Sequence, residues 1–312
     1  MLFKKLRIDR SHGVAPHKPV LLLTIMQAFN NGQITSEKIF ITPELVASFR
    51  INWNKLVITN HNCLISYPFY FLKSEPFWKL IPKLGFFNLN DITSLVKSFA
   101  RLNAAVDYAE IDQDLFVLME NEKTNAVLQQ YLLDEYFPST KNRFNNSIEQ
   151  QLNLFNRIED KILNEDAAVY AQEIKILIKE NEEEEIFLRG SLFKREIPKI
   201  YNNTCSISGM RIDALINISM IDACHIKPFS VSYDDTITNG IALCPNLHRA
   251  FDRGLIAIDD NFKMMVSDGF TESENNYSIK AFAGKEIALP SNIAYYPLNE
   301  NFRWHVENVF WG

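Results

Sequence analysis

The chain has little cysteine, no net positive charge and no long apolar run, and each shortage excludes a class of protein. Four cysteines in 312 residues are too few for a disulfide-stapled secreted scaffold. No run of eighteen or more apolar residues occurs, and the start, MLFKKLRIDRSHG, lacks the apolar stretch of a signal peptide. We therefore expect a soluble cytoplasmic protein with no membrane partner.

The formal net charge of −6 argues against a general polyanion binder, but the charge is unevenly distributed. Residues 1–30 carry five basic side chains against one acidic one, a local balance of +4, and residues 189–211 have the same balance. These two patches indicate either surfaces that meet phosphate or surface charge scattered by chance.

The first 137 residues predict a compact, aromatic-rich α+β domain. Residues 17–33 and 42–57 have helical patterns, the second with Thr42 as N-cap and Pro43 at the first helical position. The segments YPFYFL (67–72) and FWKLIP (77–82) are predicted as short strands. Residues 92–108 and 122–137 are predicted as helices.

The rest of the chain is predicted to hold a helical linker and a second domain. A polar stretch begins at residue 138, and apolar residues at helical spacing follow it, so we assign 138–188 to the linker. From 189 to 312 we expect a strand at 215–226, a loop, a strand at 241–244, a helix at 245–254 and a hairpin at 255–266. The predicted fold class of the whole chain is α+β.

Five residues of this second domain have side chains suited to catalysis or metal binding: Asp222, His225, Asn239, His248 and Asp252. On a helix His248 and Asp252 are one turn apart, so both can bind one cation. A nitrogen and a carboxylate suit one divalent metal, with Mg²⁺ or Mn²⁺ expected first and Zn²⁺ or Ni²⁺ also compatible. Hydrolysis of a phosphodiester needs a base for water and a cation for the developing charge, and this set supplies both.

The stretch CSISGMRIDALINISMIDACHIKPFSVSYDDTITNGIALCPNLHRAFDRGLIAID resembles the HNH endonucleases, whose active site is a ββα-metal motif. The resemblance implies that His225 is the general base and that Asn239 holds the loop and orients this base. It also implies that His248 and Asp252 are metal ligands. Many members have an aspartate directly before the base; here Cys224 stands there, and Asp222, on the same strand face, is the expected substitute.

Many HNH proteins also hold a structural zinc with two Cys-x-x-Cys pairs. Here Ser208 and Leu247 replace the second cysteine of each pair, so we expect no four-cysteine zinc and assign Cys205 and Cys244 to packing. The preceding segment, RGSLFKREIPKIYNNTCSISG, resembles the start of the same subgroup. Arg189, Lys194 and Arg195 in it are predicted to hold DNA phosphates, although each could also be an ordinary surface charge.

The N-terminal segments GVAPHKPVLLL and SYPFYFLKSEPFWKL resemble the sulfur-binding domain of DNA phosphorothioation-dependent restriction endonucleases, in which an HNH domain follows. In that family an apolar pocket with a basic rim receives the sulfur. The resemblance places the pocket on these residues: His17, Lys18, Tyr67, Pro68 and Phe71. The same segments are also compatible with an ordinary helix start and a core strand.

The sequence thus predicts a modification-dependent restriction endonuclease that binds phosphorothioated double-stranded DNA and cuts a nearby phosphodiester with one divalent metal. Cutting both strands needs two sites, which favours a homodimer. One alternative is an HNH nuclease that reads another DNA mark, such as modified cytosine, or a partner protein. Another is a DNA-binding regulator with a catalytically dead nuclease fold.

Overall fold

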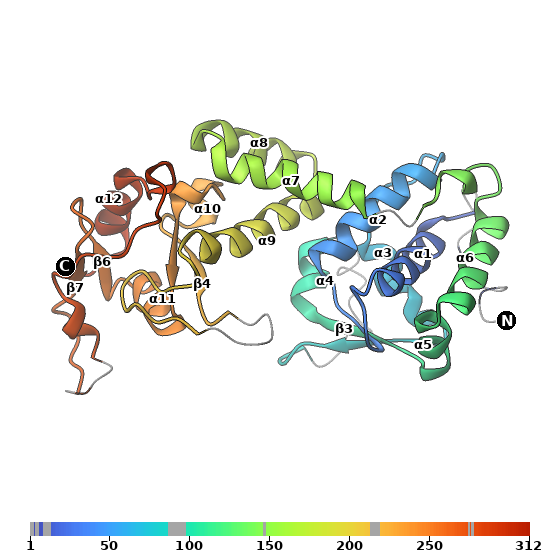
Figure 1. Cartoon of the computed structure of the whole chain (residues 1–312), viewed down its shortest axis with the longest axis horizontal. Coiled ribbons are helices and arrows are strands. Elements are labelled where there is room, and N and C mark those ends of the chain that lie inside the picture. Colours follow the sequence, from blue (N-terminus) through green and yellow to red (C-terminus); the bar gives the residue numbers. More distant parts are fainter. Residues whose placement is uncertain are drawn as a thin grey trace. The chain divides into compact units, whose positions relative to one another are not determined.

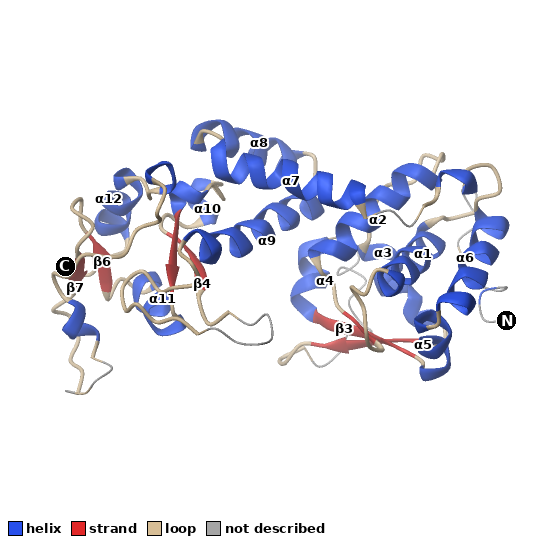
Figure 2. Cartoon of the chain, in the orientation of Figure 1, coloured by secondary structure: helices blue, strands red, loops and turns tan. Residues whose placement is uncertain are grey.

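The computed structural model describes residues 3, 6–8, 14–86, 98–145, 148–212, 219–273, 275 and 278–312. The chain divides into two compact units: unit 1 is Met1–Leu154 with Glu183–Leu188, and unit 2 is Phe155–Glu182 with Arg189–Gly312. Each unit combines helices with small antiparallel sheets, which confirms the α+β class (Figures 1 and 2).

Within the described part of the chain, no helix combines the length and the apolarity that crossing a bilayer requires.

Helix α1 (His17–Asn30) forms the centre of unit 1. Its residues from Lys18 to Phe29 are all buried, as expected for a helix that is apolar around most of its circumference. Thr42 caps helix α2 (Pro43–Leu56) by accepting a hydrogen bond from Leu45 N at 3.1 Å, which agrees with the predicted helix start. The other elements of this unit are β1 (Lys38–Ile39), α3 (Ser66–Phe71), β2 (Trp78–Pro82), α4 (Phe99–Ala105), β3 (Val106–Ile111), α5 (Gln113–Glu120) and α6 (Glu122–Tyr136).

Two predictions for unit 1 are wrong in part. The segment 67–72 was predicted as a strand, but it forms most of helix α3. A short apolar run has no periodicity that separates strand from helix, and Pro68 fits in the first helical turn. A helix was predicted over 92–108, but strand β3 begins at Val106 and pairs with both β1 and β2. Residues 92–97 of that prediction lie outside the described residues.

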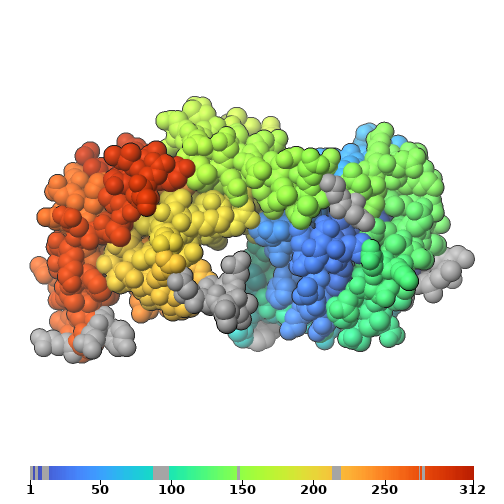
Figure 3. Space-filling view, in the orientation of Figure 1, coloured from blue at the N-terminus to red at the C-terminus, as the bar shows by residue number. Residues whose placement is uncertain are grey.

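Three helices follow where a helical linker was predicted: α7 (Glu149–Asn164), α8 (Ala167–Lys179) and α9 (Glu183–Ile200). Helix α8 belongs to unit 2 and lies at the surface (Figure 3), where Val169 and Ile176 are exposed. The division of the chain into a DNA-reading domain, a linker and a nuclease domain stays a prediction about roles.

The remaining part of unit 2 is built around a strand pair and a helix: β4 (Asp222–His225), α10 (Phe229–Ser232), β5 (Gly240–Leu243) and α11 (Pro245–Asp252). Strands β4 and β5 are antiparallel, with Asp222 opposite Leu243 and His225 opposite Gly240. Residues 215–218 of the strand predicted at 215–226 lie outside the described residues. The hairpin of β6 (Ile256–Ile258) and β7 (Met264–Val266) forms as predicted, and α12 (Asn299–Asn308) packs on β6.

Gly254 ends the α11 segment and has to be glycine. Its φ of 68° lies in the left-handed region, and a Cβ atom built on it would lie 2.0 Å from the carbonyl oxygen of Val309. This close approach holds the C-terminal end of the chain against the turn that follows α11.

Candidate functional site

The end of β4 and helix α11 face one cavity of about 290 Å³ in unit 2. His225 is the last residue of β4, whereas His248 and Asp252 lie one turn apart on α11, as the sequence spacing required. All three line this cavity, together with Ile226, Pro228, Phe229, His305 and Val309. The fold therefore brings the predicted base and two predicted metal ligands to one place.

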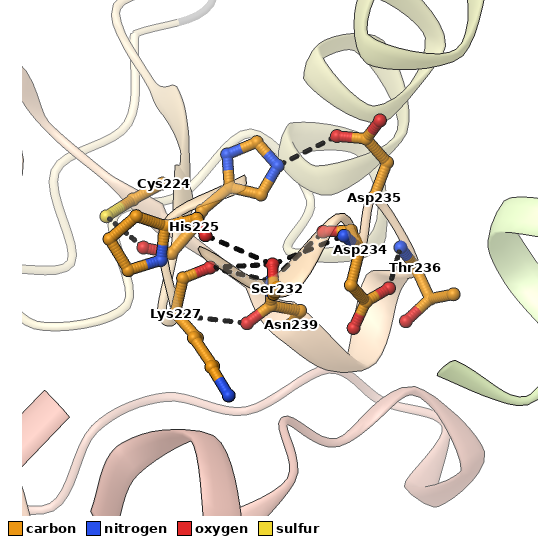
Figure 4. A network of polar contacts seen from close by, with 9 residues as sticks. Cys224, His225, Lys227, Ser232, Asp234, Asp235, Thr236 and Asn239 are labelled. Atoms are coloured by element: carbon orange, nitrogen blue, oxygen red, sulfur yellow. Dashed lines mark hydrogen bonds and ion pairs between the residues drawn. The ribbon is translucent and has the colours of Figure 1, made fainter. Parts of the chain in front are cut away.

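Asn239 is fully buried and holds together the loop between β4 and β5. Its side-chain oxygen accepts from Lys227 N at 2.9 Å, and its amide donates to Lys227 O at 2.9 Å and to Asp234 O at 3.0 Å (Figure 4). Its own carbonyl accepts from Ile226 N at 2.9 Å. These backbone contacts fix the chain directly after His225, which is the arrangement that the predicted role of Asn239 needs.

His225 is held by a ring on one side and a carboxylate on the other. Its imidazole stacks on Phe193 with ring centroids 4.0 Å apart and an interplanar angle of 13°. Its Nε2 lies 2.9 Å from Asp235 Oδ1 (Figure 4). A carboxylate only accepts hydrogen bonds, so Nε2 carries the proton and Nδ1 keeps its lone pair. An imidazole in this state can take a proton from a water at Nδ1.

His248 lies between two carboxylates. Its Nδ1 is 3.1 Å from Asp222 Oδ2, and its Nε2 is 3.4 Å from Asp252 Oδ2. A neutral imidazole has one donor and one lone pair, so one carboxylate accepts its proton and the other faces the nitrogen that can bind a metal.

The thiol of Cys224 completes a set of possible metal ligands. Ligand atoms of Cys224, His248 and Asp252 all lie within 4.8 Å of one another, and Cys224 Sγ is 3.9 Å from Asp252 Oδ1. Burial raises the pKa of Cys224 well above its usual value, and the charges of Asp252 and Asp222 raise it further. The negative charges of Asp252 and Asp222 disfavour a thiolate at Cys224, and a bound cation would offset this repulsion. The sulfur, nitrogen and oxygen donors in this arrangement therefore fit a divalent metal.

Residues 205–259 match a family model described as HNH endonuclease. They form an HNH endonuclease domain. The search of curated proteins finds no match. One solved structure with similarity is a "Modification dependent TagI restriction endonuclease", at 18% sequence identity and a TM-score of 0.28, and the likeness covers 38% of this chain and 38% of that chain.

Helix α9 places the three predicted phosphate-binding residues in different surroundings. Arg189 is buried and donates to Glu173 Oε2 at 3.1 Å, so it is enclosed in the protein. Arg195 is half-buried and donates to Glu159 and Glu196. Lys194 is exposed. Of the three, Lys194 has the placement that phosphate binding needs, and the predicted phosphate role of all three stays a prediction.

Cys205 and Cys244 lie together, with Ser208 beside them. Ser208 N donates to Cys205 Sγ at 3.4 Å, and Ser208 Oγ is 3.9 Å from Cys244 Sγ. The Cys244 thiol donates to the sulfur of Cys205, which lowers the pKa of Cys205 to about 5 and raises the pKa of Cys244. The pair is thus a small hydrogen-bonded cluster under β5.

A second cavity, of about 640 Å³, lies in unit 1 and collects the five residues predicted for the sulfur pocket. Helix α3 explains this, because a helix puts Tyr67, Pro68 and Phe71 on neighbouring positions of one face. A strand would have turned Tyr67 and Pro68 to opposite sides. The residues that line it are Arg7, Ile8, Ala15, His17, Lys18, Asn60, His61, Asn62, Tyr67, Pro68 and Phe71.

His17 forms an uncharged aromatic wall of this cavity. Burial lowers its pKa to about 4; the hydrogen bond to Asn62 opposes this shift, and the nearby His61 adds to it. Its Nε2 therefore donates to Asn62 O at 2.9 Å, and its ring lies 5.7 Å from that of Tyr67. At neutral pH the cavity thus offers an apolar ring surface here instead of a cation.

Lys18 is not at the rim. It is 7% exposed, and its Nζ donates to Glu75 Oε1 at 2.6 Å, to Ser74 Oγ at 2.8 Å and to Arg7 O at 2.8 Å. The charge of Lys18 is therefore already paired with the buried carboxylate of Glu75. Arg7, in contrast, is exposed and lines the same cavity.

The sequence patterns did not indicate three features of these sites: Asp235, Arg7, and the place of the Cys224 thiol among the possible metal ligands. Asp235 lies in the Asp-Asp pair of the loop between base and Asn239, where no fixed spacing points to a histidine ten positions earlier. Arg7 was counted in the basic patch of residues 1–30, but no motif separated it from its neighbours; the other basic residues before it, Lys4 and Lys5, lie outside the described residues.

Proposed function

We propose that the protein is a modification-dependent restriction endonuclease, in which unit 1 binds phosphorothioated double-stranded DNA and the HNH domain hydrolyses a nearby phosphodiester. The observation that carries this proposal is the meeting of all five predicted pocket residues at one cavity, in a chain that also contains an HNH domain. Because one such site cuts one strand, cleavage of both strands calls for two copies of the chain, and a homodimer is part of the proposal.

The cavity of unit 1 suits a sulfur atom on an anionic backbone. Sulfur in place of a non-bridging oxygen is larger and less well hydrated, so an apolar wall favours it over oxygen. The neutral ring of His17, the ring of Tyr67 and the side chain of Pro68 provide that wall. The charge of Lys18 is already paired with the buried Glu75, so Lys18 does not serve as the cation for the phosphate. The exposed Arg7 is placed to contact the phosphate charge instead.

In the HNH domain His225 accepts a proton from water at Nδ1, and Asn239 keeps the backbone after it in place. His248, Asp252 and Cys224 would hold one divalent cation, which when bound would stabilise the charge on the leaving oxygen. Asp222 then accepts the proton of His248 Nδ1 and orients this ring, the usual task of a carboxylate behind a metal-binding histidine. The sequence had predicted Asp222 as a ligand, and the geometry supports this neighbouring role instead.

Substitutions in the cavity should separate recognition of sulfur from recognition of charge. Tyr67→Ala is expected to reduce the preference for a duplex with one phosphorothioate over the matched plain duplex by about 10-fold or more, since apolar pockets give discrimination of roughly 10–200-fold. Arg7→Ala is expected to weaken binding of both duplexes and to lower the salt dependence of binding by about one counterion. Fluorescence anisotropy with the full chain at several salt concentrations measures both effects.

Tyr108→Ala and Arg143→Ala are the matched controls. Tyr108 is half-buried and packs against Phe40, as Tyr67 packs against Phe71, but it does not line the cavity. Arg143 is an exposed arginine of unit 1 that does not line it either. Equal loss of sulfur preference in the Tyr67 and Tyr108 variants would contradict the proposed pocket.

A further inference from the structure

The carboxylate of Asp235 is buried and has one hydrogen-bond donor among the described residues, the imidazole of His225. The side chain of Asp235 is 3% exposed, and its Oδ1 lies 2.9 Å from His225 Nε2. Its Oδ2 is enclosed and has no hydrogen-bond partner in that part of the chain. A buried carboxylate with so few donors costs free energy, so stability alone does not explain it.

The loop that carries Asp235 is built to present it. Tyr233 follows α10 with a φ of 56°, a left-handed conformation that is strained for a tyrosine. The turn is held on both sides, because Tyr233 N donates to Phe229 O at 2.8 Å and Asn239 donates to Asp234 O at 3.0 Å. The residue after this fixed point is Asp235, whose side chain points to the ring of His225 (Figure 4).

The carboxylate of Asp235 lies beside α9, because a Cβ atom built on Gly190 of that helix would be 3.9 Å from Asp235 Oδ2. Arg189 of α9 is buried, with its guanidinium 5.2 Å from the ring centre of Tyr170 on α8. Burial raises the pKa of Tyr170; the charge of Asp235 raises it further and that of Arg189 lowers it, so both charges act on this hydroxyl. Glu173 accepts a hydrogen bond from Arg189 at 3.1 Å and another from Lys161.

We infer that Asp235 is a positioning residue for the general base: its carboxylate keeps the proton of His225 on Nε2 and so leaves Nδ1 to accept the proton of water. The inference rests on the proposed role of His225 as the base. The carboxylate also favours the positively charged ring that forms when water loses its proton, as in other His–Asp pairs. The charges of Asp235 and of the buried Arg189 both act on the hydroxyl of Tyr170, which puts this arginine in the electrostatic surroundings of Asp235.

The test compares two neighbouring aspartates of the full chain. Asp235→Asn keeps the size of the side chain but removes the charge that faces His225. Asp234→Asn is the control, because Asp234 is also buried but its carboxylate accepts a hydrogen bond from Thr236 N at 2.7 Å, whereas the hydrogen bond to the ring of His225 is made by Asp235. We expect Asp235→Asn to lower single-turnover cleavage at saturating DNA on the order of 10²-fold, with DNA affinity and melting temperature unchanged. Asp234→Asn should keep most of the rate.

Proton NMR gives a readout that does not depend on cleavage. The wild type should show a downfield, slowly exchanging ring N–H resonance that disappears in His225→Ala, shifts in Asp235→Asn and persists in Asp234→Asn. A resonance unchanged by Asp235→Asn overturns the inference, and so does an unchanged cleavage rate. If the wild type cuts no DNA with any divalent metal, the proposed function fails, while the resonance still decides whether Asp235 holds the proton of His225.

Discussion

His225→Ala is expected to reduce DNA cleavage by about 10²–10⁴-fold and to leave DNA binding unchanged. The loss is large because His248, the other histidine of this cavity that faces a carboxylate acceptor, is a proposed metal ligand and so does not replace His225 as the base. His305 also lines the cavity, but it is 2% exposed and stacks on Phe251 at 3.7 Å, so it belongs to the core. Single-turnover cleavage and anisotropy binding of the same duplex measure the two quantities.

Ser230→Ala is the control for this variant, since Ser230 is exposed on α10, between β4 and β5, and does not line the cavity. It should cut at the wild-type rate. Cleavage by His225→Ala at more than a tenth of the wild-type rate would contradict the assignment of His225 as the base. Loss of DNA binding in that variant would favour the alternative of a DNA-binding regulator instead.

Removal of the metal, or of its ligand His248, is expected to abolish cleavage. The donors Cys224, His248 and Asp252 come together to hold a cation, and without it the charge of the leaving oxygen would lose the partner that the proposal gives it. Chelation should stop cleavage, and added Mg²⁺ or Mn²⁺ should restore it in the wild type. His248→Ala should stay inactive at any metal concentration, because α11 then lacks its nitrogen ligand.

Binding of Co²⁺ tests the sulfur ligand separately from activity. We expect wild-type protein to develop a sulfur-to-cobalt charge-transfer absorption, and Cys224→Ser to lack it. Cys63→Ser is the control, because Cys63 lies in unit 1 and outside this group of ligands. A band that survives in Cys224→Ser would show that Cys224 does not bind the metal and that Asp222 is again the candidate.

The parts of the site that the sequence predicted well are those in which local geometry fixes the spacing. His248 and Asp252 are four residues apart, and a helix of any protein would put them on one face. Asn239 precedes β5 by one residue, so its position follows once the strand is recognised. The five pocket residues, by contrast, were placed by resemblance, and they meet at one cavity although the local structure predicted for 67–72 was wrong.

The parts that the sequence did not reveal depend on long-range packing. Nothing local indicates that Asp235 faces His225 or that Arg189 is buried with Tyr170, since the first contact joins the loop after α10 to β4 and the second joins α9 to α8. Lys18 appeared to be a cation at a rim because Glu75, its partner, lies 57 positions away along the chain. Charge patterns in a sequence do not show which charges are already paired inside the fold.

The central claim is that the mark bound by unit 1 decides whether the HNH domain cuts. The most direct measurement is the cleavage rate of the full chain, in Mn²⁺, on two duplexes of identical sequence that differ in one sulfur. The account predicts cleavage of the phosphorothioate duplex at least about 10-fold faster than that of the plain duplex, with the difference removed by Tyr67→Ala. Equal cleavage of both duplexes by the wild type would contradict it.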